Sequence, residues 1–529
     1  NQWAALAALA AHHTGRPCKI RLDRDEDFVL TGKRHDARVD WEVGFSSTGQ
    51  ITAIDLQFLV RCGCSADLSQ GAIDRMIMHA DNAYFLPSAR IASQRLRTHT
   101  VSNTAFRGFG APKGVLAIET VMQAIATRLG VDALDVRKAN FYGNHGAVTP
   151  YGMQVDSSVT GRRIMEQLEK TSDYRVRREA VARFNDSSTI LKKGLALTPV
   201  KFGISFTQPH LNQAAALIHL YPDGSIHLSH GGTEMGQGLF QKVAQIVADE
   251  LGVPLSTLHI ASTRSDKVPN ASPTAASAGS DLNGMAARNA ALTLRSRLAT
   301  FLAEKHQCSA VDIQFANGKV RFGDSVMSFA EVVKSAYLAR IQLSASGFYK
   351  TPKLDWDRMR KTGRPYYYFV WGAACSEVII DTMTGENKVL RTDLLHDVGH
   401  SLNPALDRGQ IEGGFIQGLG WLTTEELVYD AEGRLRTHAP STYKIPVAAD
   451  VPEIFNVALW QEPNDEATIY RSKGVGEPPL VLASSVFCAL MDAIGSLAPG
   501  HPVHLDAPAT PEAVLRAIEH LAKKTQEAA

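Results

Sequence analysis

The strongest constraint on the fold of this chain is a pair of β-hairpins separated by helical segments. Strand-forming residues flank Pro222-Asp223-Gly224, and a second pair of strand-like segments flanks a turn at 382–386. Between the hairpins, residues 239–251 place apolar side chains at helical spacing and stop at Gly252. Strands and helices that mix without a fixed repeat predict an α/β (α+β) fold with mixed sheets and flanking helices.

Other elements follow from local signals along the chain. Asp132 can cap a short helix that runs toward Phe141, and Ser328 with Glu331 has the spacing of a capping box. The remaining predicted elements are helices at 4–10, 115–129, 164–168, 175–184, 329–339 and 514–522, strands at 39–43 and 51–60, and hairpin strands at 216–221, 225–229, 377–381 and 388–393.

The chain is expected to form more than one domain. Its 529 residues are too many for a single core. A long loop rich in glycine and proline, from Tyr142 to Gly152, separates the first group of elements from the second. We therefore predict two domains, residues 1–160 and 161–529.

Charge and composition exclude several classes of partner. With 55 Lys and Arg residues against 54 Asp and Glu residues, the chain has no net field that would attract nucleic acid or an anionic membrane. No stretch approaches the roughly 20 apolar residues of a membrane span, so Leu480–Leu490 is predicted to be a buried helix. The first residues lack Met and a basic segment, which indicates the interior of a helix that begins upstream. Six scattered cysteines favour reduced thiols in a cytoplasmic protein.

A glycine-rich segment, Gly231–Gly238, lies between a predicted strand and a predicted helix. Such a loop lets backbone amides approach an anion at a helix N-terminus. It is not a nucleotide-binding P-loop, because Gln237 stands where that motif requires lysine, and its glycine spacing excludes the dinucleotide-binding fingerprint. A tight structural turn and an anion site both remain open.

Three further segments are rich in small residues. Residues 272–281 could wrap a polar ligand with backbone donors or serve as a flexible linker. The run Arg107-Gly108-Phe109-Gly110 is either a shaped loop that presents two side chains or a plain turn. The segment Gly409–Trp421 carries several glycines among polar residues, which fits close packing or a ligand but excludes a membrane-helix contact face.

Glu477 is the candidate general base. It stands in Ser472-Lys473-Gly474-Val475-Gly476-Glu477-Pro478-Pro479, where two prolines hold the backbone rigid ahead of an apolar helix. A lone glutamate is most often a solvated loop residue, whereas a rigid, partly buried carboxylate is suited to proton abstraction. The local pattern leaves both interpretations open.

Taken in order, these segments resemble the molybdenum hydroxylase family, the family of the xanthine and aldehyde oxidases. The resemblance covers nearly the whole chain, and the stretch Pro440–Pro446 agrees with it. Five blocks carry it: Thr104–Gly110, Lys201–Thr207, Gly232–Gly238, Ser272–Ser277 and Val475–Pro479. It implies molybdenum-cofactor-binding domains whose upstream part is missing. A glycine-rich block that ends in a purine-contacting Lys-Glu pair would precede Asn1.

The resemblance implies roles for the site residues. Glu477 matches the general base of a hydroxylation in which water supplies the oxygen. Arg75 matches an arginine that faces the oxygen of a purine and stabilises negative charge there. Phe109 and Phe206 match two aromatic rings that hold the heterocycle. Residues expected to line the pocket around them are Leu68, Thr207 and Leu211.

The resemblance also implies a molybdenum cofactor, a molybdopterin with or without an appended cytosine nucleotide. Its dithiolene holds the metal, so no direct protein ligand to molybdenum is expected. The expected cofactor-binding residues are Phe106, Arg107, Gly236, Gln237, Ala275, Ala276, Ser277, Gly279, Ser280, Gln410 and Gly476. Electrons are expected to leave through 2Fe–2S and FAD centres on other segments or on a partner subunit, in a heterotetramer or a dimer of heterodimers.

Arg75 separates the substrate classes, because aldehyde-oxidising members of the family generally lack this arginine. The resemblance therefore favours oxidation of hypoxanthine to xanthine and of xanthine to urate. Two alternatives remain open. The first is an aldehyde or N-heterocycle oxidase of the same family. The second is a non-catalytic module for cofactor binding or assembly, which the missing upstream wall of the cavity favours.

Two positions depart from the family pattern. Ala111 follows the Arg-Gly-Phe-Gly run where the family usually has glycine, and Gly474 precedes Val475 where it usually has alanine. Because glycine has more backbone freedom to lose, Gly474 is expected to loosen the loop of Glu477 slightly.

Overall fold

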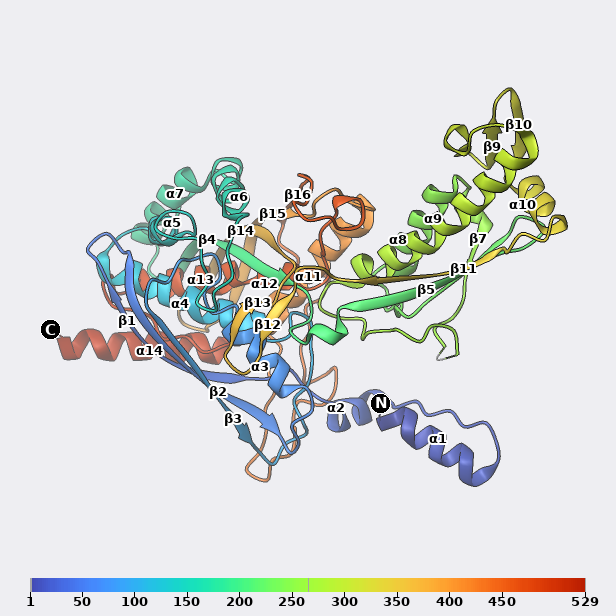
Figure 1. Ribbon diagram of the computed structural model, residues 1–529. Coiled ribbons are helices and arrows are strands. Elements are labelled where there is room, and N and C mark those ends of the chain that lie inside the picture. The colour runs from blue at the N-terminus through green and yellow to red at the C-terminus, as the bar shows by residue number, and fades with distance from the viewer. Residues whose placement is uncertain (1, 265, 529) are drawn as a thin grey trace.

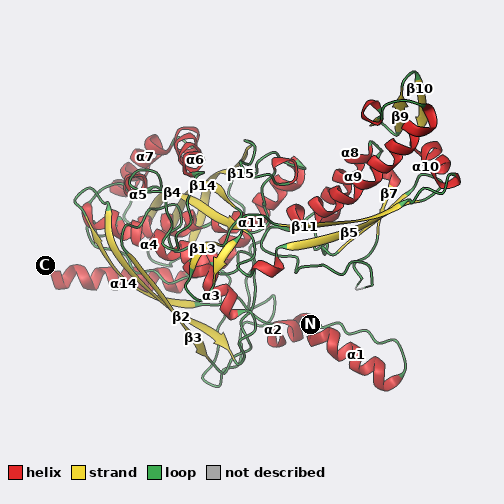
Figure 2. Cartoon of the chain, in the orientation of Figure 1, coloured by secondary structure: helices red, strands yellow, loops and turns green. Residues whose placement is uncertain are grey.

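The structure of the chain is a computed structural model that describes residues 2–264 and 266–528. Figure 1 shows an elongated molecule in which a narrower lobe extends from a broad body. The lobe carries helices α8 (Leu239–Leu251), α9 (Gly279–His306) and α10 (Phe329–Leu338). Figure 2 shows helices and strands mixed in both parts, so the predicted α/β (α+β) class with mixed sheets is confirmed.

The main sheet of the body has the strand order β16-β15-β14-β4. Strand β14 (Tyr368–Asp381) pairs antiparallel with β4 (Leu191–Ile204) and with β15 (Asn387–Asp397), whereas β16 (Ile454–Trp460) is parallel to β15. Strand β4 is buried along residues 194–204. Such continuous burial is expected of a strand that helices cover on both faces.

Glycines allow these helices to approach the sheet closely. A Cβ at Gly194 of β4 would lie 1.9 Å from the carbonyl oxygen of Ala489 in α13 (Ser484–Gly495). On the opposite face, Trp371 of β14 fills the space above Gly161 of α6 (Ser158–Thr171), where a Cβ would lie 2.2 Å from the indole. Glycine is therefore required at both helix contacts.

A second sheet of the body, β1-β2-β3, is covered on one face. Strand β1 (Ala37–Phe45) pairs antiparallel with β2 (Ile51–Gly63), and β3 (Ala89–Arg97) is parallel to β2. In β2 every second residue from Ile54 to Val60 is buried, as expected for a strand with one face on a core. That core includes α4 (Ala111–Leu129) and α5 (Ala133–Asn140).

The same core extends past residue 160. It includes Ile164 of α6, Tyr174 of α7 (Tyr174–Ser187) and Trp371 of β14. A separate core contains residues of α4 and β4 and extends from β5 to α14. The domain boundary at 160 stays a prediction.

The lobe is built on a sheet of order β11-β5-β6-β7. Helix α9 packs directly on it, because a Cβ at Gly347 would lie 2.0 Å from the carbonyl oxygen of Ala286. A small sheet of order β10-β9-β8 lies with α10 at the far end of the lobe (Figure 1). The strands of the lobe are β5 (Gln213–Leu220), β6 (Ile226–His230), β7 (Leu258–Ile260), β8 (Gln314–Ala316), β9 (Lys319–Phe322), β10 (Ser325–Ser328) and β11 (Ser344–Lys350).

Shorter and peripheral elements complete the fold. Helix α1 (Gln2–Thr14) extends from the body, and none of its residues is buried. The others are α2 (Arg24–Leu30), α3 (Ser69–Ile77), α11 (Pro404–Thr423), α12 (Pro478–Val481), α14 (Pro511–Ala528), β12 (Asp355–Asp357), β13 (Thr362–Arg364), η1 (Pro209–Leu211), η2 (Leu255–Thr257), η3 (Ala310–Asp312), η4 (Ala448–Asp450) and η5 (Ile469–Arg471).

The predictions from local signals are confirmed. Both hairpins form, Asp132 accepts a hydrogen bond from Leu134 N, and Ser328 and Glu331 form the capping box. The apolar stretch at 478–495 is long enough to span a membrane by composition, but 89% of it is buried inside the protein. The linker interpretation of 272–281 is wrong for its second half, because Ala276, Ala278 and Asp281 are buried and α9 begins at Gly279.

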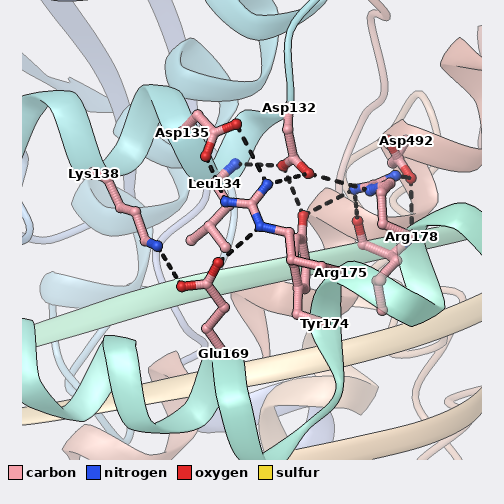
Figure 3. Close-up of polar contacts among 10 residues, drawn as sticks. Asp132, Leu134, Asp135, Lys138, Glu169, Tyr174, Arg175, Arg178 and Asp492 are labelled. Atoms are coloured by element: carbon pink, nitrogen blue, oxygen red, sulfur yellow. Dashed lines mark hydrogen bonds and ion pairs between the residues drawn. The ribbon is translucent and has the colours of Figure 1, made fainter.

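A charge network ties α5 to the helices that follow it (Figure 3). Asp132 accepts hydrogen bonds from Tyr174 Oη and Arg175 Nη1, and Arg175 also pairs with Asp135 and Glu169. From α7, Arg178 pairs with Asp492 of α13. The network therefore holds α5, α6, α7 and α13 together beside the main sheet.

Candidate functional site

Helix α3 presents Arg75 to the interior, and two glycines allow it to pack closely on α4. A Cβ at Gly110 would lie 1.8 Å from the carbonyl oxygen of Ala72, and a Cβ at Gly114 would lie 2.3 Å from that of Met76. Gly110 is the last residue of the Arg-Gly-Phe-Gly run. That run is therefore a shaped loop fixed by the packing of α3, rather than a plain turn.

Arg75 is buried, with 2% of its surface exposed. Its Nη1 donates to Ser205 O at 2.9 Å and its Nη2 donates to Gly203 O at 2.5 Å. The guanidinium carbon lies 4.8 Å from the ring centre of Phe202 and 5.3 Å from that of Tyr366. Among the described residues its Nε has no hydrogen-bond partner. This Nε is itself buried, so the guanidinium presents its charge rather than an accessible donor to the site.

His79 fixes the helix that carries Arg75. Gly203 N donates to His79 Nε2 at 3.1 Å, so the proton of the neutral ring is on Nδ1, which lies 2.8 Å from Arg75 O. Burial and the charge of Arg75 lower the pKa of His79 well below its usual value. His79 is therefore a neutral bridge between α3 and β4.

The two predicted aromatic residues come from two different segments. Phe109 lies just before α4, and Phe206 lies just after β4. Phe109, at φ +55°, contacts α3 at Gly71, where a Cβ would lie 3.2 Å from its ring. Phe206 follows Ser205, and Asn212 holds it on both sides by accepting from Phe206 N and donating to Phe206 O. Both rings are half-buried, which leaves surface available for a flat ligand.

Glu477 stands at the start of α12 with 14% of its side chain exposed. Ser277 Oγ accepts a hydrogen bond from Glu477 N at 2.6 Å and donates to Glu477 Oε2 at 3.2 Å. The same Oε2 lies 3.9 Å from Arg75 Nη2. The interpretation of Glu477 as a solvated loop residue is therefore wrong.

The structure thus brings the four principal predicted residues to one group. Arg75 contacts Glu477 and the segment of Phe206 directly, and the ring of Phe109 packs one helical turn before Arg75. A separate hollow of about 950 Å³ beside α8 contains none of them. The site is therefore identified by its contacts rather than by the size of a hollow.

Arg107 joins the aromatic loop to the glycine-rich helix and to the loop of Glu477. Its Nε donates to Gly476 O at 2.6 Å, and its Nη2 donates to Gln410 O at 3.0 Å and lies 3.3 Å from Gln410 Oε1. Burial lowers the pKa of Arg107 to about 10, while Glu477 acts in the opposite direction. The guanidinium therefore remains a cation at neutral pH.

The glycines of α11 have two different surroundings. A Cβ at Gly414 would lie 2.9 Å from Arg107 Nη2, and one at Gly418 would lie 2.2 Å from Leu480 O, so these two allow close packing. At Gly409 and Gly413 a Cβ would meet no atom within 4 Å. The helix therefore combines a packed side with an open side next to Gln410.

The glycine loop 231–238 binds a carboxylate of its own. The amides of Gly236 and Gly238 donate to Glu234 Oε1, and the amide of Phe240 donates to Oε2. Burial opposes ionisation, but these amide hydrogen bonds lower the pKa of Glu234 below its usual value. The structural-turn interpretation of this loop is supported, because the amides of Gly236 and Gly238 are already satisfied.

Gln237 likewise bonds inside the loop, with Met235 N and Thr233 O. Thr233 N donates to Thr274 Oγ1 at 2.8 Å, which places the loop against the segment that precedes α9. The cofactor contacts expected of Gly236 and Gln237 stay predictions.

The segment 275–280 fits a large anionic cofactor. Ala276 and Ser277 are both left-handed, at φ +56° and +54°, and the 28-residue helix α9 begins at Gly279. The amides of a helix's first turn and its positive dipole favour a phosphate group. Together with the Arg107 cation, this arrangement suits the phosphate of a pterin cofactor.

The remaining predicted residues differ in their exposure. Leu68 is 48% exposed and Phe106 is 42% exposed, with the guanidinium carbon of Arg34 at 4.5 Å from the Phe106 ring centre. Thr207 is buried and Leu211 is half-buried in η1. Across the described residues no group of three or more His, Cys, Asp or Glu could hold a metal ion.

Several contributors were not predicted from the sequence. Arg34 Nη2 donates to Arg107 O at 2.8 Å and so supports the loop from the other side. His79 lies four residues after Arg75, in the turn that follows α3, and could have been found from that spacing. Tyr368 and Gln417, which contact the loops of Glu477 and Arg107, carry no local signal.

The expected loosening at Gly474 is wrong. Gly474 N donates to Tyr368 Oη at 2.9 Å, and a Cβ on Gly474 would lie 2.5 Å from Ser277 O. Glycine at this position permits close approach of the Glu477 loop to the 275–280 segment rather than flexibility.

We therefore expect Gly474→Ala to push Ser277 away from Glu477 and to lower kcat by roughly 10- to 100-fold, as a displacement of about 1 Å does at reacting groups. Gly495→Ala is the matched control, because its Cβ would meet only ordinary contacts, 3.5 Å from Val503. Steady-state kinetics and thermal unfolding of both variants check this. Equal turnover in the two variants would contradict it.

Two family profiles match the chain, and both are described as a molybdopterin cofactor-binding domain. One covers residues 1–141 and the other covers residues 167–452. The gap between them contains the predicted boundary at residue 160.

Relatives and solved structures agree with these matches. Xanthine dehydrogenase/oxidase from Felis catus is 44% identical over 96% of this chain and 37% of its own length. Nicotinate hydroxylase from Emericella nidulans is 40% identical over 97% of this chain and 36% of its own length. The chain thus spans little more than a third of these relatives. Quinoline 2-oxidoreductase from Pseudomonas putida 86 shares the fold, with a TM-score of 0.84 at 23% identity over 97% of this chain and 66% of that one.

Proposed function

The chain belongs to the molybdopterin cofactor-binding domain family, and from that premise we propose that it is the catalytic part of a purine hydroxylase. The observation that carries the proposal is the contact between a buried guanidinium and a partly buried carboxylate, Arg75 and Glu477, beside two half-buried rings. The names of the xanthine dehydrogenase relatives support the same substrate class.

The chain's own residues account for binding and proton transfer. Phe109 and Phe206 offer ring surface to a flat heterocycle, and the buried charge of Arg75 favours negative charge that develops on that heterocycle. Glu477 Oε2 is held by Ser277 and is placed to take a proton from the oxygen that attacks the ring carbon.

The cofactor would be held by Arg107, Gln410, Ser277 and the first turn of α9, with Gly476 closing the group through its hydrogen bond to Arg107. When bound, the molybdenum cofactor supplies the two-electron oxidising capacity, and water is the source of the oxygen. No side chain needs to bind the metal directly, because the dithiolene of the cofactor would hold it.

An assay of the full-length protein tests the proposal. We expect kcat/KM for xanthine to exceed that for an aromatic aldehyde by roughly 100-fold, because a site built to bond polar groups of its substrate rejects analogues that lack them. Molybdenum analysis of the same preparation accounts for unloaded protein. A kcat/KM that favours the aldehyde would reject the purine assignment, and bound molybdenum with no turnover of either compound would favour a non-catalytic cofactor-binding module.

An N-heterocycle other than a purine is the second candidate, because a relative named nicotinate hydroxylase is nearly as similar as the xanthine dehydrogenases. Nicotinate as a third compound in the same assay separates the two. Turnover of nicotinate that exceeds turnover of xanthine would select this candidate.

We also propose that electrons leave through 2Fe–2S and FAD centres on other segments or on a partner subunit, in a heterotetramer or a dimer of heterodimers. The length of the relatives supports this, because the chain matches only 37% of them. A cytoplasmic location is proposed because all six cysteines, including the exposed Cys18 and Cys64, are free thiols. Size-exclusion chromatography with iron and flavin analysis tests the assembly.

A further inference from the structure

A buried tyrosine connects three segments of the candidate site. Tyr368 is the first residue of β14 and pairs with Ile204, two residues before Phe206. Its hydroxyl accepts a hydrogen bond from Gly474 N at 2.9 Å and donates to Asp281 Oδ2 at 2.7 Å. Gly474 lies three residues before Glu477, and Asp281 lies in the first turn of α9, directly after the 275–280 segment.

The direction of these hydrogen bonds is fixed by proton counting. Gly474 N can only donate, so the tyrosine oxygen accepts there and the single hydroxyl proton points to Asp281. Burial raises the pKa of Tyr368 well above its ordinary value, so the hydroxyl keeps that proton. Burial also raises the pKa of Asp281 to about 7, while the hydrogen bond from Tyr368 and the charge of Lys242 act against this shift.

All three partners are removed from solvent. Tyr368, Asp281 and Gly474 are buried, so water cannot replace a lost hydrogen bond without rearrangement. On the other side of the loop, Ser277 holds Glu477 by two hydrogen bonds. Asp281 lies only four residues after Ser277. Tyr368, through Asp281, and Ser277 therefore both attach the Glu477 loop to the start of α9.

We propose that Tyr368 and Asp281 are positioning residues that set the place of Glu477 by anchoring the Gly474 amide to the first turn of α9. The inference rests on the proposed function of Glu477 as a base and assigns a role to two residues that act through the Glu477 loop. Neither residue is part of the group formed by Arg75, Phe109, Phe206 and Glu477.

The test is Tyr368→Phe in the full-length holoenzyme. We expect kcat to fall roughly 10-fold or more with KM within about 2-fold of wild type, because the proton-accepting atom moves while the binding rings and Arg75 stay in place. In the same variant, amide exchange of a peptide containing Gly474 is expected to become roughly 5- to 10-fold faster, since one buried hydrogen bond is lost.

The matched control is Tyr142→Phe. Tyr142 also donates from a buried hydroxyl to a buried aspartate, Asp81, at 2.6 Å, but it belongs to the first core and has no contact with the Glu477 loop. We expect its kcat to stay within about 2-fold of wild type. If kcat fell equally in Tyr368→Phe and Tyr142→Phe, the effect at Tyr368 would be general destabilisation. That result would overturn the proposal.

Two further outcomes separate this proposal from the proposed function. Unchanged kcat and unchanged exchange at Gly474 in Tyr368→Phe would overturn the positioning role, whatever the substrate. If wild type fails to oxidise xanthine, the purine assignment fails, but the exchange result still tests the anchor.

If Tyr368→Phe does not fold, Asp281→Ala is the substitute variant. Asp281→Asn keeps an acceptor for the tyrosine hydroxyl, so it is expected to restore most of the turnover that Asp281→Ala loses.

Discussion

Replacing Glu477 by glutamine is expected to lower kcat for xanthine by about 10²- to 10⁴-fold, the range over which general bases contribute. Glutamine keeps the size of the side chain and a carbonyl oxygen for Ser277, but it cannot accept the proton. Molybdenum content is expected to stay at the wild-type level, because the amide of residue 477 still bonds to Ser277 Oγ. Steady-state kinetics with metal analysis measures both quantities.

Glu169→Gln provides the comparison for this variant. Glu169 has 15% of its side chain exposed, close to the 14% of Glu477, and it also pairs with cations, Lys138 and Arg175 (Figure 3). Glu169 lies outside the candidate site, so the kcat of Glu169→Gln is expected to remain near that of wild type. Near-normal turnover in Glu477→Gln would remove Glu477 from its role.

Replacing Arg75 by methionine is expected to lower kcat/KM for xanthine by about 10²- to 10³-fold, the usual effect of removing one donor from developing negative charge. The loss for an aromatic aldehyde is expected to stay below about 10-fold, because an aldehyde without a ring acceptor does not use the guanidinium. The ratio of the two losses is therefore the measurement that assigns the role of Arg75.

That ratio is needed because Arg75 also has a structural function. It donates to the carbonyls of Gly203 and Ser205, and these acceptors lose their partner in the variant. Such a loss affects every substrate, so equal losses for xanthine and aldehyde would show that Arg75 supports β4 rather than the purine. Arg75→Lys keeps the charge but not the planar guanidinium. Its kcat/KM for xanthine is expected to lie between the values of wild type and Arg75→Met.

Much of the fold could be predicted because its signals are local. The hairpins at 222–224 and 382–386 and the caps at Asp132 and Ser328 depend on turn and cap chemistry within a few residues. Helix α9 was not predicted, although it is 28 residues long. Its buried side consists largely of alanines such as Ala286 and Ala290, which pack against the lobe sheet without an obvious stripe of large apolar residues.

The candidate site could not be predicted from spacing. Its residues were identified by resemblance to a family, and the contacts that join them cross large sequence separations. Arg75 bonds to Ser205, 130 residues away, and Arg107 bonds to Gly476, 369 residues away. Such contacts depend on tertiary packing, so local propensity carries no information about them. The roles of Tyr368 and Glu234 became visible only with the three-dimensional contacts.

The long reach of Arg107 has a consequence for biosynthesis. Because its guanidinium bonds to Gly476, 369 residues further along the chain, a nascent polypeptide that has emerged only as far as α9 contains the aromatic loop and the helix start but not the Glu477 loop. Domains otherwise fold in order as they leave the ribosome. The contacts proposed to hold the cofactor are therefore complete only after the segment through Gly476 has been synthesised.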